Sequence, residues 1–172
     1  MADQKLTGIL LVGGSSTRFG SPKALARLGG ETLAERAWRL VGDVCAERLA
    51  AGRGEGLPFP TLADEGTGPV AGIAAGLRAA TNEVALVVPV DMPLLTADAL
   101  RLLADACRDA AVAQTGPLPC ALARRTLPAF EAGERRLGTV LEGLDTARVQ
   151  LDEHLLANVN EPDDLRRIAA SE

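Results

Sequence analysis

Gly8-Ile9-Leu10-Leu11-Val12-Gly13-Gly14 is the stretch of the 172-residue sequence that decides the fold. Its apolar run over residues 8–12 is typical of a strand that is buried on both faces, as in a parallel sheet covered by helices. The glycine pair ends the strand, and a small, polar loop follows it as far as Lys23. Ligands of open α/β sheets bind at the carboxyl ends of such strands, so we expect a binding site after Val12.

Outward from this strand, helical and strand patterns alternate along the chain. Thr32 and Glu35 have the spacing of a capping box, which predicts a helix from there to Val44. Further strands are expected at 48–51, 84–90, 111–114, 119–123 and 148–151, and further helices at 70–80, 97–109 (capped by Thr96), 136–144 and after Asn160. We therefore predict an α/β fold: a single Rossmann-like three-layer domain over residues 1–172 with a mostly parallel central sheet.

Two details of this pattern carry expectations about packing. Right-handed crossovers bring the strand ends after Val12 and Val90 to the same edge of the sheet. Gly72 and Gly76 fall inside the helix expected at 70–80. Because each glycine costs about 1 kcal/mol relative to alanine there, we expect that helix to approach the sheet or a ligand closely.

The composition argues against several classes of protein. A net charge of −5 does not suit a duplex DNA-binding face. Three widely spaced cysteines and one histidine do not suit a zinc site, and the cysteines are typical of buried thiols in a reducing compartment. The N-terminus lacks a signal-peptide hydrophobic region, and no apolar run approaches the ~20 residues of a membrane span. We expect a cytoplasmic monomer that binds neither nucleic acid nor membrane.

The loop between Gly13 and Lys23 has the composition of a polyphosphate site. Its glycines allow backbone N–H groups to approach an anion, Arg18 and Lys23 are cationic, and residues 15–17 carry hydroxyls. The loop is neither a Walker A loop nor a dinucleotide fingerprint, because the spacing of its glycines and lysine fits neither motif. The alternative interpretation is a flexible turn between a strand and a helix.

Asp91 directly follows the second apolar strand. An ionised carboxylate at that position is costly unless it is solvated or paired with a cation, and Mg²⁺ takes one or two carboxylates together with phosphate oxygens. Asp91 is therefore the predicted metal ligand, with a turn cap before Pro93 as the alternative. Asp64 is the second acidic candidate.

Five segments carry a resemblance to a known family. Gly13-Gly14-x-x-x-Arg18-Phe19-Gly20-x-x-Lys23 resembles the signature of sugar-phosphate and cofactor nucleotidyltransferases. The segments at 68–73 with Asp64 upstream, 88–93, 132–136 and 158–165 are similar to motifs of the molybdenum cofactor guanylyltransferase (MobA) family. The matches run in order over almost the whole chain, so the resemblance implies a nucleotide-diphospho-sugar-transferase-like fold.

The resemblance implies an activity, its ligands and a set of site residues. The activity is transfer of GMP from GTP to the terminal phosphate of molybdenum-molybdopterin, with release of pyrophosphate; Mg²⁺ is the expected metal and Mn²⁺ the alternative. Expected protein partners are those that deliver molybdopterin and those that mature molybdoenzymes.

The implied catalytic residues are Arg18, Lys23 and Asp91, with the metal on Asp91. The implied nucleotide-binding residues are Leu11, Val12, Gly13, Gly14, Lys23, Asp64, Gly68 and Asp91. The implied pterin-binding residues are Arg135, Arg136, Asn158 and Asn160.

This chemistry suits a chain with a single histidine. A phosphate monoester has its second pKa near ~6 and is mostly dianionic at pH 7, so the nucleophile needs no general base. Catalysis would then consist of positioning and charge neutralisation. His154 is expected to be a solvated loop residue, with a hydrogen bond to the substrate as the alternative. For the arginine pair at 135–136 the alternative is a solvated face, and for the asparagines it is a helix-start turn.

One departure from the family pattern concerns the base. The family usually carries an Asn after its second strand, where this sequence reads Ala50-Ala51-Gly52-Arg53-Gly54. Either Gly52 or Arg53 takes that place, or purine recognition differs. The alternative functions are CMP transfer to the same cofactor, a sugar-phosphate nucleotidyltransferase, and a non-catalytic carrier that binds nucleotide or molybdopterin.

Overall fold

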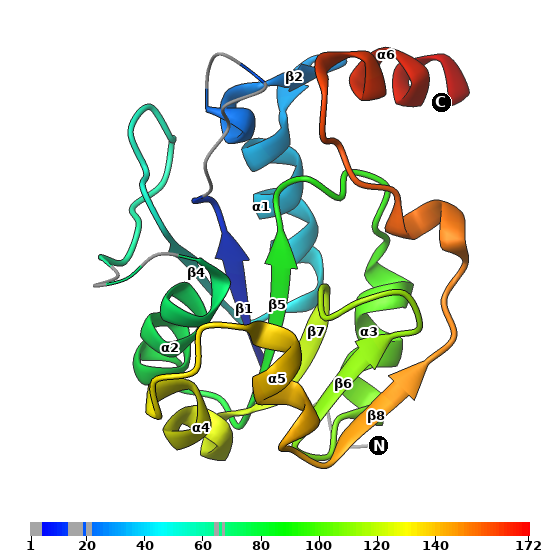
Figure 1. The fold of residues 1–172 in the computed structure, drawn as a ribbon. Coiled ribbons are helices and arrows are strands. Elements are labelled where there is room, and N and C mark those ends of the chain that lie inside the picture. The colour runs from blue at the N-terminus through cyan, green and yellow to red at the C-terminus, as the bar shows by residue number, and fades with distance from the viewer. Residues whose placement is uncertain (1–4, 14–18, 20–21, 64–65, 67) are drawn as a thin grey trace.

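A six-stranded sheet forms the centre of the protein (Figure 1). The computed structural model describes residues 5–13, 19, 22–63, 66 and 68–172. In spatial order the strands are β4 (Glu47–Ala51), β1 (Leu6–Leu11), β5 (Val84–Pro89), β7 (Cys120–Ala123), β6 (Ala110–Ala113) and β8 (Thr146–Val149). Pairing is parallel except on both sides of β7, so one strand runs against the other five. The prediction of a mostly parallel sheet is confirmed.

Helices cover both faces of the sheet and divide the apolar residues into two cores. On one face lie α1 (Leu33–Val44) and α3 (Ala97–Ala106), and on the other lie α2 (Pro69–Ala79), α4 (Leu127–Glu131) and α5 (Leu137–Glu142). Within the described residues no helix is long and apolar enough to cross a membrane. The three-layer arrangement confirms the predicted fold class.

The capping signals of the sequence locate the starts of two of these helices. The Thr32 side chain accepts a hydrogen bond from the Glu35 N–H, and the Glu35 carboxylate accepts one from the Thr32 N–H, so the predicted capping box is present. Thr96 accepts a bond from the Ala99 N–H at the start of α3. However, α3 ends at Ala106 rather than at residue 109, because Cys107 adopts an extended conformation and β6 begins three residues later.

The helix expected at 70–80 was predicted to approach either the sheet or a ligand closely, and it approaches the sheet. A Cβ at Gly76 would lie 2.7 Å from side-chain atoms of Ile9, a fully buried residue of β1. The glycine therefore lets α2 lie directly against β1. The late strand expected at 148–151 lies instead at Thr146–Val149, because its register with β6 pairs Ala110 with Thr146.

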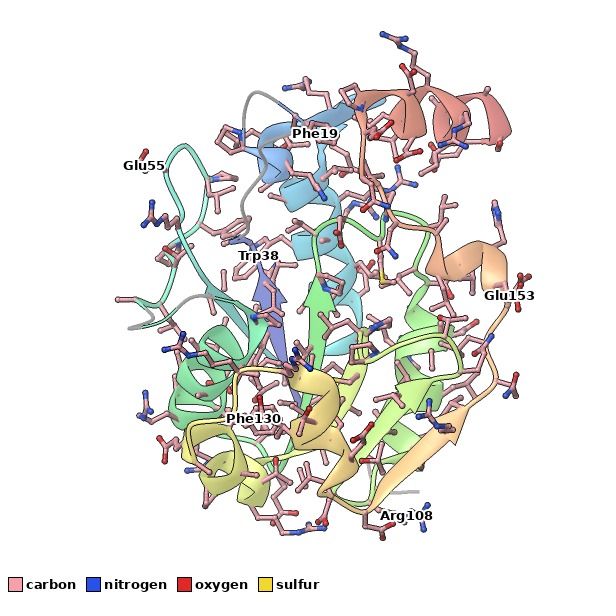
Figure 2. The ribbon with its side chains drawn as sticks, viewed as in Figure 1. Phe19, Trp38, Glu55, Arg108, Phe130 and Glu153 are labelled. Carbon is pink, nitrogen blue, oxygen red and sulfur yellow. The ribbon has the colours of Figure 1, made fainter. Side chains whose placement is uncertain are left out.

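A third, smaller cluster lies beyond the carboxyl ends of the strands. It joins the two-stranded hairpin of β2 (Arg27–Leu28) and β3 (Glu31–Thr32) to the C-terminal helix α6 (Pro162–Ser171), as Figure 1 shows at the top of the molecule. Leu28, Leu33, Val159 and Ile168 are its buried residues. Phe19 packs against this cluster, and Figure 2 shows it next to α6. The C-terminal segment thus covers the edge of the sheet at which ligands are expected.

Candidate active site

Three parallel strands end side by side and bring the predicted site residues together. Leu11, the last residue of β1, pairs with Ala51 of β4 on one side and with Pro89 of β5 on the other. Backbone hydrogen bonds extend this alignment past the strand ends. The Val12 N–H donates to the Ala51 carbonyl at 3.0 Å, and the Val90 N–H donates to the Leu11 carbonyl at 3.3 Å. The residues that follow the three strands are therefore neighbours at one edge, as predicted.

Lys23 and Asp91 form an ion pair at this edge. The Lys23 Nζ lies 3.5 Å from the Asp91 Oδ2, although the residues are 68 positions apart in the sequence. The side chains are 21% and 28% exposed, so both remain accessible to a ligand. The Lys23 Nζ also lies 5.8 Å from the centre of the Phe19 ring. The ammonium group of the pair could bind a phosphate group. The carboxylate could bind a divalent cation that contacts the same phosphate.

The carboxylate of Asp91 has the chemistry of a magnesium ligand. Mg²⁺ is held by one or two carboxylates plus phosphates and water, so a single accessible carboxylate fits this ion. In the part of the chain that the structure describes, no group of three or more His, Cys, Asp or Glu side chains could enclose a metal. Gly14, Arg18 and Asp64 lie outside the described residues.

The backbone of Asp91 is held by the C-terminal segment. The Val159 N–H donates to the Asp91 carbonyl at 2.7 Å, and the Val159 side chain is fully buried. Asn158 and Asn160, the predicted pterin residues on either side of Val159, are both exposed. The Asn160 N–H donates to the Asp164 carboxylate as α6 begins, so the backbone of Asn160 makes the helix-start turn that was the alternative interpretation.

A cavity of about 870 Å³ opens beside the end of β4. This volume is within the roughly 300–1,000 Å³ range of small-molecule sites. Its walls come from the segment after β4, the first turn of α2 and the loop between α4 and α5; they include Arg53, Val70, Ala71, Phe130, Glu134 and Arg135. Figure 2 shows Phe130 in the layer of α4 and α5, well away from Phe19. Arg135, one of the predicted pterin residues, thus lines the cavity, whereas Arg136 is an exposed residue at the start of α5.

Two glycines shape the entrance to this cavity. Gly52 has a φ of +118°, and a Cβ there would lie 2.5 Å from the Gly13 backbone nitrogen, so only glycine fits. Gly68 has a φ of +89° and is the N-cap residue of α2, followed by Pro69 in the first turn. Of the two residues proposed for the place of the family's Asn, Gly52 therefore cannot carry a side chain, and Arg53 lines the cavity.

The loop between α4 and α5 has a carboxylate at its centre. The Glu134 Oε1 accepts hydrogen bonds from the N–H groups of Arg136 and Arg135, at 2.8 and 2.7 Å, and these bonds lower the pKa of Glu134. The Glu131 Oε1 is paired with the Arg78 guanidinium at 2.5 Å. Sequence reasoning missed both glutamates and Phe130 as cavity residues, because nothing in the local sequence indicates that these segments meet, whereas Arg53 had been considered for the place of the family's Asn.

Several other groups are excluded as nucleophiles or bases. His154 is an exposed residue of the turn η3 (Glu153–Leu156), which agrees with the expected solvated loop position. Burial raises the pKa of the Cys45 thiol to about 12 and that of the Cys107 thiol to about 11. Thiols with such values stay protonated at neutral pH and are poor nucleophiles. The groups at the carboxyl edge of the sheet are therefore suited to holding anionic substrates in place and neutralising their charge.

Comparisons with known proteins agree with this arrangement. Residues 8–152 match the MobA-like NTP transferase domain. A protein of Chloroflexus aggregans named "probable molybdenum cofactor guanylyltransferase" is 35% identical over 201 residues, which cover 96% of this chain and 94% of that protein. A protein of Deinococcus radiodurans with the same name is 36% identical over 183 residues, which cover 95% and 94%.

A solved structure supports the fold. The molybdopterin-guanine dinucleotide biosynthesis protein A of Archaeoglobus fulgidus superposes with a TM-score of 0.80 at 24% identity, covering 96% of this chain and 100% of that one. The family match extends over most of the sequence, from the middle of β1 to the residue before η3, and includes Lys23, Asp91 and the cavity. The chain therefore belongs to the MobA-like NTP transferase family.

Proposed function

We propose that this protein transfers GMP from GTP to the terminal phosphate of molybdenum-bound molybdopterin. An oxygen of that phosphate attacks the α-phosphorus of GTP, the bond from the α-phosphorus to the bridging oxygen of the β-phosphate breaks, and pyrophosphate leaves with those electrons. The products are the guanine dinucleotide form of the cofactor and pyrophosphate. The names of the relatives at 35% and 36% identity support this choice of substrates.

The observation that carries the proposal is the Lys23–Asp91 pair at the shared carboxyl edge of β1 and β5, on the same edge of the sheet as the end of β4, whose following residues line the cavity. A triphosphate brings several negative charges to one place, and a lysine with an accessible carboxylate for a divalent ion can neutralise them. The reacting phosphates would lie at Gly13, Lys23 and Asp91, with the rest of the nucleotide directed along the strand ends. Gly14, Arg18, Asp64 and Gly68 complete the proposed nucleotide site, with Arg18 beside the leaving pyrophosphate.

Each of the remaining groups has a defined task. Asp91 would hold Mg²⁺, and this ion, when bound, supplies charge neutralisation on the phosphates. Lys23 orients and stabilises the phosphate oxygens as charge develops on the leaving group. Arg135 lines the cavity from the side opposite β4, which suits a contact with the phosphate of the pterin. Arg136, Asn158 and Asn160 complete the proposed pterin site.

No side chain is required as a base. The attacking phosphate is largely dianionic at neutral pH, because its second pKa is near ~6. The rate would then come from holding two anionic substrates in line while their charges are neutralised. The exposed position of His154 and the protonated state of the buried thiols agree with this mechanism.

The first test is thermal unfolding of the purified protein with Mg²⁺ and GTP, CTP or ATP in turn. A ligand present at ~100 times its Kd adds about 2.7 kcal/mol to the free energy of unfolding, or very roughly 5–10 °C for a domain of this size. We expect stabilisation by GTP alone. Stabilisation by CTP alone would identify a cytidylyltransferase. Pyrophosphate release from GTP on addition of molybdenum-molybdopterin then separates the enzyme from a non-catalytic carrier, which would bind both ligands and release nothing.

A further inference from the structure

The cavity contains two arginines that make no ion pair with another described residue. Ten salt bridges occur among the described residues, and neither Arg53 nor Arg135 takes part in any of them. By contrast, most exposed arginines outside the cavity, such as Arg39, Arg78 and Arg125, are paired with a carboxylate. Two guanidinium groups thus lie on one cavity, and among the described residues no carboxylate forms an ion pair with either. Such groups are available to a ligand.

The position of Arg53 relative to the phosphate site indicates which part of a nucleotide it would contact. Arg53 follows Gly52, whose backbone lies against Gly13 at the end of β1. Gly13 comes two residues after β1, whose last residue pairs with Pro89 of β5, and Asp91 of the Lys23–Asp91 pair comes two residues after Pro89. A nucleotide whose phosphates occupy that pair therefore extends past Gly13 and Gly52 toward the cavity. Arg53 is at the end of this path.

The other walls suit a planar ring. Val70, Ala71 and Phe130 contribute apolar surface, and Phe130 is only 4% exposed. Glu131 and Glu134 supply acceptor oxygens on the same cavity. Guanine has two adjacent acceptors, O6 and N7, on one edge and N–H donors on another. A guanidinium on one wall and carboxylates on another match this pattern.

From this arrangement we infer that Arg53 is a specificity-determining residue, whose guanidinium donates two hydrogen bonds to the O6 and N7 atoms of the guanine base of GTP. In protein–DNA complexes, the bidentate contact of arginine or lysine with O6 and N7 of guanine is the commonest specific base contact. Adenine cannot replace guanine, because a donor takes the place of O6, and cytosine has no N7. The inference rests on the proposed function, since it assumes that the nucleotide is GTP.

The test is isothermal titration of the full-length protein, with Mg²⁺, against GTP, 7-deaza-GTP and CTP. The variants are Arg53→Ala and Arg53→Lys. The latter keeps the charge but loses the fork of donors. Arg148→Ala is the matched control, because Arg148 is an exposed arginine on β8, the strand at the opposite edge of the sheet from β4. Thermal unfolding of each variant checks that it is folded.

We expect the wild-type protein and Arg148→Ala to bind GTP about 10-fold or more tightly than 7-deaza-GTP. Both Arg53 variants should bind GTP about 10-fold more weakly than the wild type and should no longer distinguish it from 7-deaza-GTP. Binding of CTP should remain as weak in these variants as in the wild type.

Two results would overturn the inference while leaving the proposed function intact. One is an unchanged affinity of Arg53→Ala for GTP. The other is an equal loss for GTP, 7-deaza-GTP and CTP, which would assign Arg53 to the phosphates. A wild-type protein that binds no GTP, or that prefers CTP, would overturn the proposed function and the inference together.

Discussion

Val159 holds Asp91 through its backbone: the Val159 N–H donates to the Asp91 carbonyl at 2.7 Å. The bond joins the C-terminal segment to the residue that follows β5, and Asp91 in turn pairs with Lys23 through its side chain. Val159 belongs to the apolar cluster that also contains Leu28, Leu33 and Ile168, so the proposed metal ligand is fixed from the side of the hairpin and α6 as well as from the sheet. Four of the predictions below concern this arrangement.

Replacement of Asp91 by alanine should lower turnover by at least ~10²-fold, comparable to the loss of one key electrostatic stabiliser. The carboxylate is the proposed Mg²⁺ ligand, and its ion pair with the Lys23 ammonium would be lost. Pyrophosphate release at saturating GTP, with Mg²⁺, measures the effect. Asp98→Ala is the control, because Asp98 is a highly exposed residue of the first turn of α3. Near-normal turnover of Asp91→Ala would exclude the metal assignment.

Much of this site could be predicted because its signals are local. An apolar run followed by a glycine pair or an aspartate marks the end of a buried strand, and parallel pairing brings such ends together. Gly13 and Asp91 were assigned in this way, whereas Lys23 was assigned from the composition of the loop that follows Gly13. Thr32 with Glu35 likewise located the start of α1, because a capping box is formed by residues three positions apart.

The remaining features depend on contacts between distant segments. The hairpin of β2 and β3 has strands of two residues, too short to give a periodic pattern, and the reversed direction of β7 depends on its pairing with β5 and β6. The cavity walls come from three separate segments, so Phe130 and Glu131 carry no local signal of their position on the cavity. The bond from Val159 to Asp91 is likewise made between residues 68 positions apart.

Replacement of Lys23 by alanine should weaken GTP binding by roughly 10-fold, because hydrogen bonds to charged groups contribute about 1.5–3 kcal/mol. Titration calorimetry with Mg²⁺ and GTP gives the Kd. Lys5→Ala is the matched control, since Lys5 is an exposed lysine immediately before β1, at the amino edge of the sheet. If Lys23→Ala bound GTP as tightly as the wild type, the phosphate contact would have to be reassigned to Arg18.

Replacement of Val159 by proline should lower kcat by about 10-fold or more, because proline has no N–H for the Asp91 carbonyl and small displacements of a reacting group are costly. Val159→Ala is the control: it loses buried methyl groups but keeps the backbone bond. Both variants are expected to be less stable, so kcat is compared at a temperature where each is fully folded. Equal kcat values for the two variants would show that the bond does not position Asp91.

Two glycine substitutions in helices should have opposite effects on stability. In Gly76→Ala the new methyl group would lie 2.7 Å from the buried Ile9 side chain, so the free energy of unfolding should fall by about 1–3 kcal/mol. In Gly138→Ala, at an exposed position of α5 with no atom within 4 Å of the new Cβ, it should rise by about 0.4–1 kcal/mol. Urea unfolding of both variants tests this, and a stabilised Gly76→Ala would contradict the packing of α2 against β1.

The start of α6 should depend on the charge of Asp164. Its carboxylate accepts hydrogen bonds from the N–H groups of Asn160 and Glu161, at 2.8 and 2.9 Å, and these bonds lower the pKa of Asp164 in the folded protein. A lowered folded-state pKa means that the stabilisation is complete above the unfolded value of ~3.9 and is lost as the pH falls through the folded value. Amide hydrogen exchange at Asn160 and Glu161 should therefore show increased local opening below about pH 4.

Asp164→Asn should show the same opening at pH 7, whereas Asp163→Asn, which alters the neighbouring exposed carboxylate, should not. Protection in Asp164→Asn equal to that of the wild type at pH 7 would mean that the cap does not hold α6 over the site.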